Sequence, residues 1–458
     1  MHINIQPTAV VKKALRFSTA EGMAYGAFLG FGDHFIVAFA VALHANNFLI
    51  GILCSLPGFL ASLSQLWGGD LARIMKSRKK LVMVFALLQG LMFIPMMALF
   101  FFPRGSQGWW LVLFVCIYSI FGALVSPAWG SLMADVVPNN LRGRYFSLRG
   151  GLSTLTTIVT FLLGGLFLNF LVQRAMWGFV VLFGAALLAR LVSFLLLARL
   201  YEKPTEARGE AESRLTEYVR GLPSTNLGRY MIFLFAMSFV VSIASPYFAV
   251  YQLRDLKFSY LAFAALETVS SVATLLTIRH WGQAADRAGN LKMMYLASAL
   301  IPLVPLLWAV SSNLAYLGLV QAFSGFAWAG FSLCSVNYLY DATARETRTR
   351  YLGYFNAGNG MASGLGALLG GYLATHLPPF RGYQILSLFL ISGILRGAVS
   401  IILLRRLKEV RRVSDIPAAE LFHIMMGGRP VNRRISHRRT SHFHDHEQAE
   451  GKTDKPPA

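Results

Sequence analysis

The chain has 458 residues, of which 55% are hydrophobic and only 14% are charged. A soluble domain carries about 25% charged residues, so this chain lacks the charge that a water-facing surface needs, which excludes an ordinary soluble protein. The formal net charge of +21 would suit a nucleic-acid partner, but the placement of the basic residues favours a membrane-topology signal instead. The composition therefore indicates an all-α polytopic membrane protein.

Twelve apolar runs are long enough to cross a bilayer, whose hydrocarbon core of about 30 Å takes about 20 helical residues. We predict the twelve spans, in chain order, at 19–44, 47–71, 81–102, 109–134, 145–172, 176–200, 230–252, 259–280, 293–312, 314–340, 351–376 and 383–405.

The basic residues gather in alternate connections between these spans. The connections on one side hold only Arg104, Arg174, Arg254, Lys257 and Arg381. The connections on the other side, together with both chain ends, hold nearly all the remaining lysines and arginines. Because basic loops stay on the cytoplasmic side, we expect a multi-pass protein of the cell (inner or plasma) membrane with both termini in the cytoplasm.

The chain divides into two repeated halves. We predict a cytoplasmic N-terminus at 1–18, a six-helix bundle at 19–200, a cytoplasmic linker at 201–229, a second bundle at 230–405, and a basic, histidine-rich and largely disordered cytoplasmic tail at 406–458. Residues match at a constant offset of 206, including Asp135 with Asp341, Arg142 with Arg348, Arg190 with Arg396, and Gly164-Gly165 with Gly370-Gly371. Matches in one register indicate a duplicated unit.

A glycine-and-charge string occurs once in each half. It reads WGQAADRAGNLK at 281–292 and, less completely, WGGDLARIMKSRKK at 67–80. Two six-helix halves with such strings after their second helices resemble the major facilitator superfamily, whose signature there is Gly-x-x-x-Asp-Arg-x-Gly. The second copy matches at Gly282, Asp286, Arg287 and Gly289, and the first copy matches only at Gly68 and Arg73.

The resemblance implies that these strings latch the two halves at the cytoplasmic gate and release when that gate opens. We expect an asymmetric latch in which 281–292 dominates, with Gly282 allowing a tight helix end close to a neighbour. Two further acid–arginine sets, Asp135 with Arg142 and Asp341 with Arg348, either pair structurally within each half or belong to the same gate.

Ionisable groups at membrane depth are functional hypotheses by default. Asp33 and His34 lie in the first span, after a Gly22, Gly26, Gly30 stripe that allows close packing or bending. The resemblance implies that helices 1, 4, 7 and 10 line a central cavity, which makes Asp33 the first candidate for a proton or cation site. The alternative is an aspartate that is hydrogen-bonded for structure alone.

Other polar residues in the spans complete the predicted substrate or proton site. Glu267 is the candidate partner of Asp33 in a proton relay, and a structural pair with an arginine is the alternative. The remaining candidates are Tyr118, Gln321, Trp328, Asn356 and Asn359. Arg149, near the end of a span, is expected to extend its charge toward the membrane surface, and the repeat-equivalent Arg190 and Arg396 are expected to share a structural role.

The chain has no phosphate-binding Walker loop and no Gly-x-Ser-x-Gly elbow, so we predict neither an enzyme nor a cofactor. His442, His444 and His446 could bind a metal, but a solvated tail is the preferred reading and no metal site is predicted. We predict a monomeric secondary active transporter of a small organic solute, working by alternating access in the lipid bilayer, with protons as the candidate coupling ion and no nucleic-acid partner. The alternatives are an uncoupled facilitator and a transporter-like sensor or scaffold that signals through the tail. The fourth and fifth helices lack the antiporter hallmarks of the family, which makes drug efflux less expected.

Overall fold

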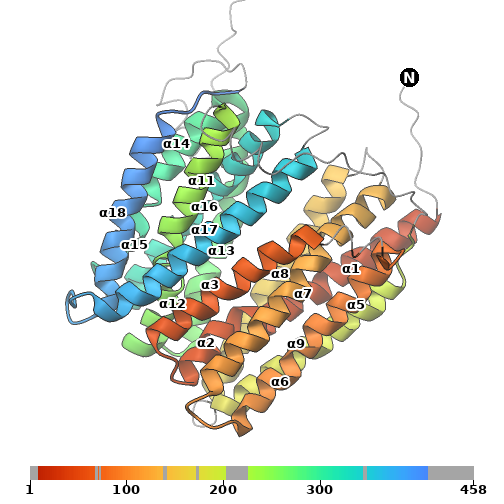
Figure 1. Cartoon of the computed structure of the whole chain (residues 1–458), viewed down its shortest axis with the longest axis horizontal. Helices are drawn as coiled ribbons and strands as arrows, with labels where there is room; N and C mark the ends of the chain where they lie inside the picture. The colour runs from red at the N-terminus through yellow and green to blue at the C-terminus, as the bar shows by residue number, and fades with distance from the viewer. Residues whose placement is uncertain are drawn as a thin grey trace, which may run out of the picture.

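The computed structural model describes residues 9–67, 71, 74–137, 142–171, 175–202, 225–343 and 348–410. Within these ranges, eleven helical stretches are long and apolar enough to cross a membrane. The twelfth, α17 (Arg348–His376), has 29 residues and falls short only because its sequence is rich in glycine and polar residues. The predicted all-α fold of twelve membrane helices is thus confirmed (Figure 1). The linker from 203 to 224 and the tail after 410 lie outside the described residues.

The N-terminal half contains six spans, three of which are built from consecutive segments. In order they are α1 (Ala9–Phe31) with η1 (Asp33–Phe35) and α2 (Ile36–Ala42); α3 (Asn47–Ser64) with η2 (Gln65–Trp67); α5 (Arg78–Leu91) with α6 (Phe93–Ala98) and η3 (Leu99–Phe101); α7 (Gln107–Val136); α8 (Arg142–Phe170); and α9 (Ala175–Ala198).

The C-terminal half repeats this order. Its spans are α11 (Asn226–Ser242) with α12 (Tyr247–Val250) and η6 (Tyr251–Asp255); α13 (Tyr260–Ala288); α14 (Asn290–Leu300) with α15 (Leu303–Trp308); α16 (Leu314–Ala342); α17; and α18 (Gln384–Leu404). The offset of 206 reappears in the structure, because Gly165 and Gly371, which match at this offset, lie in α8 and α17, the fifth helices of the two halves. The two halves are therefore structural repeats as well as sequence repeats.

Two predicted boundaries need correction. The first helix already includes Ala9, the first described residue, ten residues before the predicted start of the span at 19. The eighth span, predicted to end at 280, continues to Ala288, so most of the string at 281–292 is helix and not loop. The helix ends at Gly289, whose φ of +91° is a conformation that favours glycine. Gly282 lies inside the helix, and a Cβ there would be 3.5 Å from Leu333, an ordinary contact. Gly289, and not Gly282, makes the helix end.

The glycine stripe of the first helix lets α1 and α8 approach closely, as the sequence predicts. A Cβ on Gly26 would lie 2.3 Å from the carbonyl oxygen of Ser153, and a Cβ on Gly30 would lie 2.0 Å from the hydroxyl of Thr160. Small residues at a helix interface allow this kind of backbone approach within a membrane. The stripe therefore fixes the first helix against the fifth.

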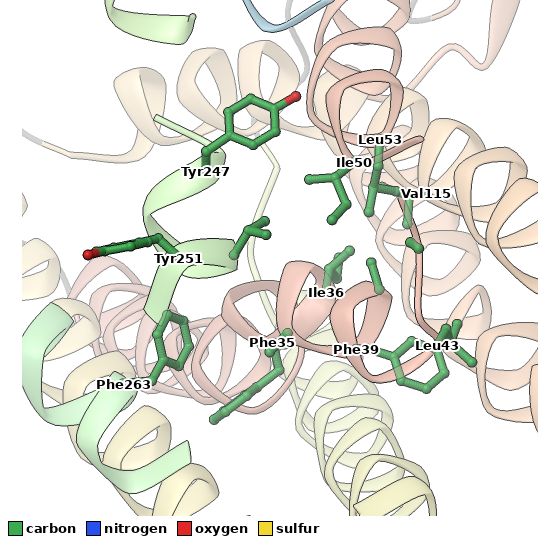
Figure 2. Close-up of a cluster of buried hydrophobic side chains, with 14 of the residues drawn as sticks. Phe35, Ile36, Phe39, Leu43, Ile50, Leu53, Val115, Tyr247, Tyr251 and Phe263 are labelled. Carbon is green, nitrogen blue, oxygen red and sulfur yellow. The ribbon is translucent and has the colours of Figure 1, made fainter. Parts of the chain in front are cut away.

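Apolar packing differs between the two ends of the molecule. We call the end at which α1 begins and α18 ends the terminal end, and the opposite one the far end. At the far end a single buried cluster contains residues of both halves, among them Phe35, Ile50, Tyr247 and Phe263 (Figure 2). At the terminal end each half has its own cluster, one around Leu132 and the other around Trp281. Among the described residues, the halves thus share a buried core at the far end and have separate ones at the terminal end.

Repeat-equivalent glycine pairs make the contact between the halves. A Cβ on Gly165 of α8 would lie 2.6 Å from the Cβ of Ala264 and 2.8 Å from the carbonyl oxygen of Tyr260, both in α13. A Cβ on Gly371 of α17 would lie 3.3 Å from the Cα of Gly51 in α3. The seam therefore has two related contacts, α8 with α13 and α17 with α3.

Candidate functional site

The first helix of each half is broken at membrane depth. In the N-terminal half the helix changes to a 3₁₀ turn, η1, which consists of Asp33, His34 and Phe35. In the C-terminal half α11 ends at Ser242, and after an irregular stretch the chain forms α12 and then a π-helical turn, η6. Broken membrane helices lie at the substrate and ion sites of many secondary transporters. Asp33 lies within one of these breaks.

The Asp33 carboxylate accepts a hydrogen bond of 3.0 Å from the hydroxyl of Tyr118 on α7. Tyr118 is buried, whereas Asp33 and its neighbour His34 are exposed. The imidazole of His34 lies 5.1 Å from the ring of Phe161 on α8. The structure thus brings Asp33 and Tyr118 together, and among the residues that it describes Tyr118 is the one hydrogen-bond partner of this exposed aspartate.

Glu267 on α13 forms the centre of a second polar cluster. Its carboxylate accepts hydrogen bonds from the side-chain amides of Gln321, at 3.1 Å, and Gln252, at 3.3 Å. Both glutamines are buried, and the carbonyl oxygen of the Gln252 side chain has no partner among the described residues. Glu267 and Gln321 were predicted site residues; Gln252, in the π-helical turn, was not. Among the residues that the structure describes, the partners of the Glu267 carboxylate are side-chain amides. The alternative prediction, a structural pair with an arginine, is not what these contacts show.

The two acids lie in separate clusters. Within the described part of the chain, no hydrogen bond joins Asp33 to Glu267. Aromatic rings connect their surroundings: Phe161, which contacts His34, lies 5.7 Å from the ring of Phe263 on α13, one helical turn before Glu267. A direct relay between the two carboxylates therefore remains a prediction.

The other predicted cavity residues are scattered. Asn359 on α17 accepts a hydrogen bond from Ser238 on α11, and Asn356, one turn earlier, is exposed. Trp328 packs against Phe331, 5.6 Å away, in the terminal-end cluster of its own half. Asn359 thus connects two helices of one bundle, and Trp328 is part of a core.

A polar contact between the halves supplements the shared core at the far end. Asn47, at the start of α3, donates from its side chain to the carbonyl oxygen of Ala374, at 3.0 Å. Its own backbone carbonyl accepts from the hydroxyl of Tyr247, and its side-chain oxygen accepts from Arg254. One residue of the N-terminal half is thus bonded to two spans of the other half.

The predicted gate residues are described only in part. Gly68 and Arg73 lie outside the described residues, and the side chains of Asp135, Arg142 and Arg348 are not described. Asp341 accepts a hydrogen bond of 2.7 Å from Asn290, in its own half. Asp286 and Arg287 are exposed, and both have interaction partners. The two string copies differ at their tryptophans, because Trp281 is fully buried and Trp67 is 58% exposed.

A third polar cluster was not predicted. Glu21 of α1, which is buried, pairs with Arg149 of α8 at 2.6 Å. The guanidinium of Arg149 lies 3.9 Å from the ring centre of Trp129. Arg149 therefore does not extend to the membrane surface; it turns inward because a carboxylate and an indole face bind it there. The available signal was the acid itself, inside an apolar span at position 21.

The repeat-equivalent arginines have different partners. Arg190 donates to the carbonyl oxygen of Ala86 and to Gln89, both on α5. Arg396 donates to the carbonyl oxygen of Val241, beside the break after α11. Both side chains are buried and both satisfy a backbone carbonyl, which supports the predicted structural role, but the helices that they support are not equivalent.

Comparison with known proteins gives a consistent result. The family model described as Major Facilitator Superfamily matches residues 23–279 and 230–443. Among solved structures, a D-xylose–proton symporter has a TM-score of 0.67 at 16% identity, covering 89% of this chain and 100% of that one. The nucleoside transporter NupG has a TM-score of 0.64 at 14% identity, covering 88% of this chain and 100% of that one.

An inward-open structure of the xylose transporter XylE from E. coli has a TM-score of 0.64 at 14% identity, covering 92% of this chain and 100% of that one. A search of curated protein sequences gives no significant match. At these identities the structures show a shared fold and not a shared solute. Fold, repeat and family model agree: this chain belongs to the major facilitator superfamily of membrane transporters.

Proposed function

We propose that the protein is a secondary active transporter that moves a small polar organic solute by alternating access and couples this movement to protons through Asp33. By the positive-inside rule, the distribution of basic residues supports a cytoplasmic terminal end. In this orientation the shared core lies at the outer side of the membrane, and the two halves are separately packed at the cytoplasmic side.

The observation that carries the proposal is this difference between the two ends. A continuous apolar cluster, reinforced by the Asn47 contacts, joins the halves at the outer side. No buried cluster of the described residues spans both halves at the cytoplasmic side. This packing supports an inward-facing state, from which the halves would rock about their seam to expose the site to the other side.

The polar groups in the broken helices support a proton-linked site. Asp33 has one tyrosine partner and an exposed side, so its carboxylate is accessible to solvent, solute and protons. A carboxylate at membrane depth is costly while charged, so its protonation would favour the states in which water is excluded. Glu267, held by two glutamines, supplies a further acceptor for the hydroxyl or amine groups of a solute.

The experiment is a proton-movement assay on purified full-length protein in proteoliposomes. Internal pH is recorded while separate pools of pentoses, nucleosides and small organic acids are added, the first two pools being chosen from the structural neighbours. Asp33→Asn is compared with Asp33→Glu, which keeps the carboxyl group, and with Tyr118→Phe, which removes only the hydrogen-bond donor. We expect one pool to evoke proton movement that Asp33→Asn loses and the other two variants retain in part.

Other outcomes would overturn parts of the proposal. Solute uptake without a proton signal in the unmodified protein would indicate an uncoupled facilitator. A full proton signal in Asp33→Asn would remove Asp33 as the proton site and leave its bond to Tyr118 as a structural contact. No uptake from any pool, in protein that is folded and correctly inserted, would contradict the proposed range of solutes.

A further inference from the structure

The N-terminal bundle contains a cavity of its own. It has a volume of about 220 Å³ and is lined by residues of α1, α5, α7, α8 and α9, all in one half of the molecule. Because α1 packs on α8 and α9 while α5 packs on α7 and α9, the cavity lies inside the bundle, between α1 and α7. Ser126, one of its lining residues, is exposed and marks the side on which it opens. The walls of this cavity therefore belong entirely to the N-terminal half.

The charged residues in the cavity lining are one acid and two arginines. Glu21 accepts hydrogen bonds from Arg149, at 2.6 Å, and from Ser193, at 3.0 Å. Arg190 donates to Gln89 at 2.6 Å, and its guanidinium lies 5.0 Å from the ring centre of Tyr25. The nearby acid Asp33 is not in the lining and is bonded to Tyr118. The charges of the lining residues thus leave one positive charge in excess.

Free donors accompany this excess charge. A guanidinium has five N–H donors, and the hydrogen bonds of Arg149 to Ser18 and Glu21 use two of them. The indole N–H of Trp129, also in the lining, is buried and has no partner among the described residues. Buried charges and donors are normally satisfied by a partner. The cavity therefore offers donors, a net positive charge and room, with Glu21 as its one anionic group.

We propose that this cavity binds a small organic anion, whose carboxylate or phosphate group is held by Arg149 with the Trp129 indole N–H as a second donor. Arginine suits such groups because its planar fork donates two parallel hydrogen bonds. Glu21 competes with the anion for Arg149 and sets the affinity. The proposal concerns binding alone, so a protein that fails every transport assay would still bind the anion in this cavity.

The test is ligand-dependent thermal stability of the purified full-length protein in detergent, with benzoate as the probe and benzamide as its neutral counterpart of the same shape. We expect benzoate to raise the Tm and benzamide to leave it unchanged. Arg149→Gln is expected to weaken benzoate binding by at least about tenfold, because it removes a charge-assisted hydrogen bond. Lys80→Gln removes the same charge from an exposed position on α5 and is expected to bind benzoate as the unmodified protein does.

Glu21→Gln separates a binding site from a structural ion pair. If Arg149 and Glu21 only stabilise the bundle, Glu21→Gln lowers the Tm and benzoate has no further effect. If the cavity binds anions, Glu21→Gln frees Arg149 and tightens benzoate binding several-fold, even though the ligand-free protein is less stable. Arg149→Lys, which keeps the charge, is expected to retain part of the benzoate effect if Arg149→Gln does not fold.

Three results would overturn the proposal. Equal shifts with benzoate and benzamide would indicate nonspecific apolar binding, and no shift at high benzoate would exclude the site. A benzoate shift unchanged in both Arg149 variants and in Glu21→Gln would assign the anion to another part of the molecule. Inorganic phosphate is tested in parallel. A Tm shift with phosphate would indicate a site for the anionic group alone, and a shift with benzoate only would indicate that the organic portion is also required.

Discussion

The two ends of the seam between the halves are built differently. At the far end, glycines bring helix backbones together, and one apolar cluster includes residues of both halves. Gly330, in contrast, serves packing within a half: a Cβ there would lie 2.4 Å from the ring of Trp281, which belongs to the separate terminal-end cluster of the same bundle. The comparison teaches that close packing at Gly165 lies across the seam, whereas at Gly330 it lies inside a bundle, so added volume at these two positions should have different effects.

The largest expected effect comes from adding volume at the far end of the seam. Gly165→Leu places a side chain against the backbone of Tyr260, and overpacking of this kind costs about 1–3 kcal/mol. If the cost falls only on the state in which the far end is closed, it shifts the population toward a far-end-open state by about 5–150-fold. The measurement is the maleimide labelling rate of Ile50→Cys, a position buried between the halves, in protein whose three native cysteines are replaced.

Gly150→Leu is the matched control for this experiment. Gly150 lies on the same helix, and a Cβ there would have no atom within 4 Å. We expect it to leave the labelling rate of Ile50→Cys unchanged. Equal labelling in both variants would mean that the α8–α13 contact does not hold the far end closed.

The sequence predicts the seam better than it predicts the polar clusters. The twelve spans, the repeat and the positions of the glycine pairs follow from hydropathy and from one constant offset, because these features depend on residues close together in the chain or on the duplication itself. Gly165 and Gly371 even occupy related places in the two helix contacts. Duplication conserved this backbone packing, so the sequence offset located the glycine pairs, and the structure shows that they lie at the seam.

Side-chain partners were harder to predict because they come from other helices. Glu21 pairs with Arg149, 128 residues later, and Arg149 turns inward only because that carboxylate and Trp129 are present. Gln252 reaches Glu267 because the chain forms a π-helical turn there, which periodicity alone does not indicate. The equivalent arginines Arg190 and Arg396 have diverged in their partners, which shows that the duplication did not preserve this pair of polar contacts.

A smaller effect, on stability and not on the seam, is expected from Gly330→Ala. The added methyl group meets the flat face of the fully buried Trp281. A ring in a packed core has little space to move away from it. We expect a loss of about 1–2 kcal/mol of stability, measured as a lower Tm of the purified protein. The labelling rate of Ile50→Cys should stay unchanged, because this contact lies within one half; an increase would mean that the two ends are coupled through the C-terminal bundle.

The smallest expected effect is at the polar contact of the far end. Asn47→Ala removes the hydrogen bonds of its side chain to Ala374 and Arg254 but keeps the backbone carbonyl that accepts from Tyr247. The bond to Ala374 contributes about 1 kcal/mol net, and Arg254 is partly exposed and keeps its ion pair with Asp255, so labelling of Ile50→Cys should rise by less than in Gly165→Leu. Asn47→Asp is the matched variant: it loses the donor to Ala374 and keeps an acceptor for Arg254, so its labelling rate should lie between those of Asn47→Ala and the unmodified protein. If Asn47→Ala instead opened the far end as fully as Gly165→Leu does, the hydrogen bonds, and not the glycine contacts and the shared apolar core, would be what holds the two halves together there.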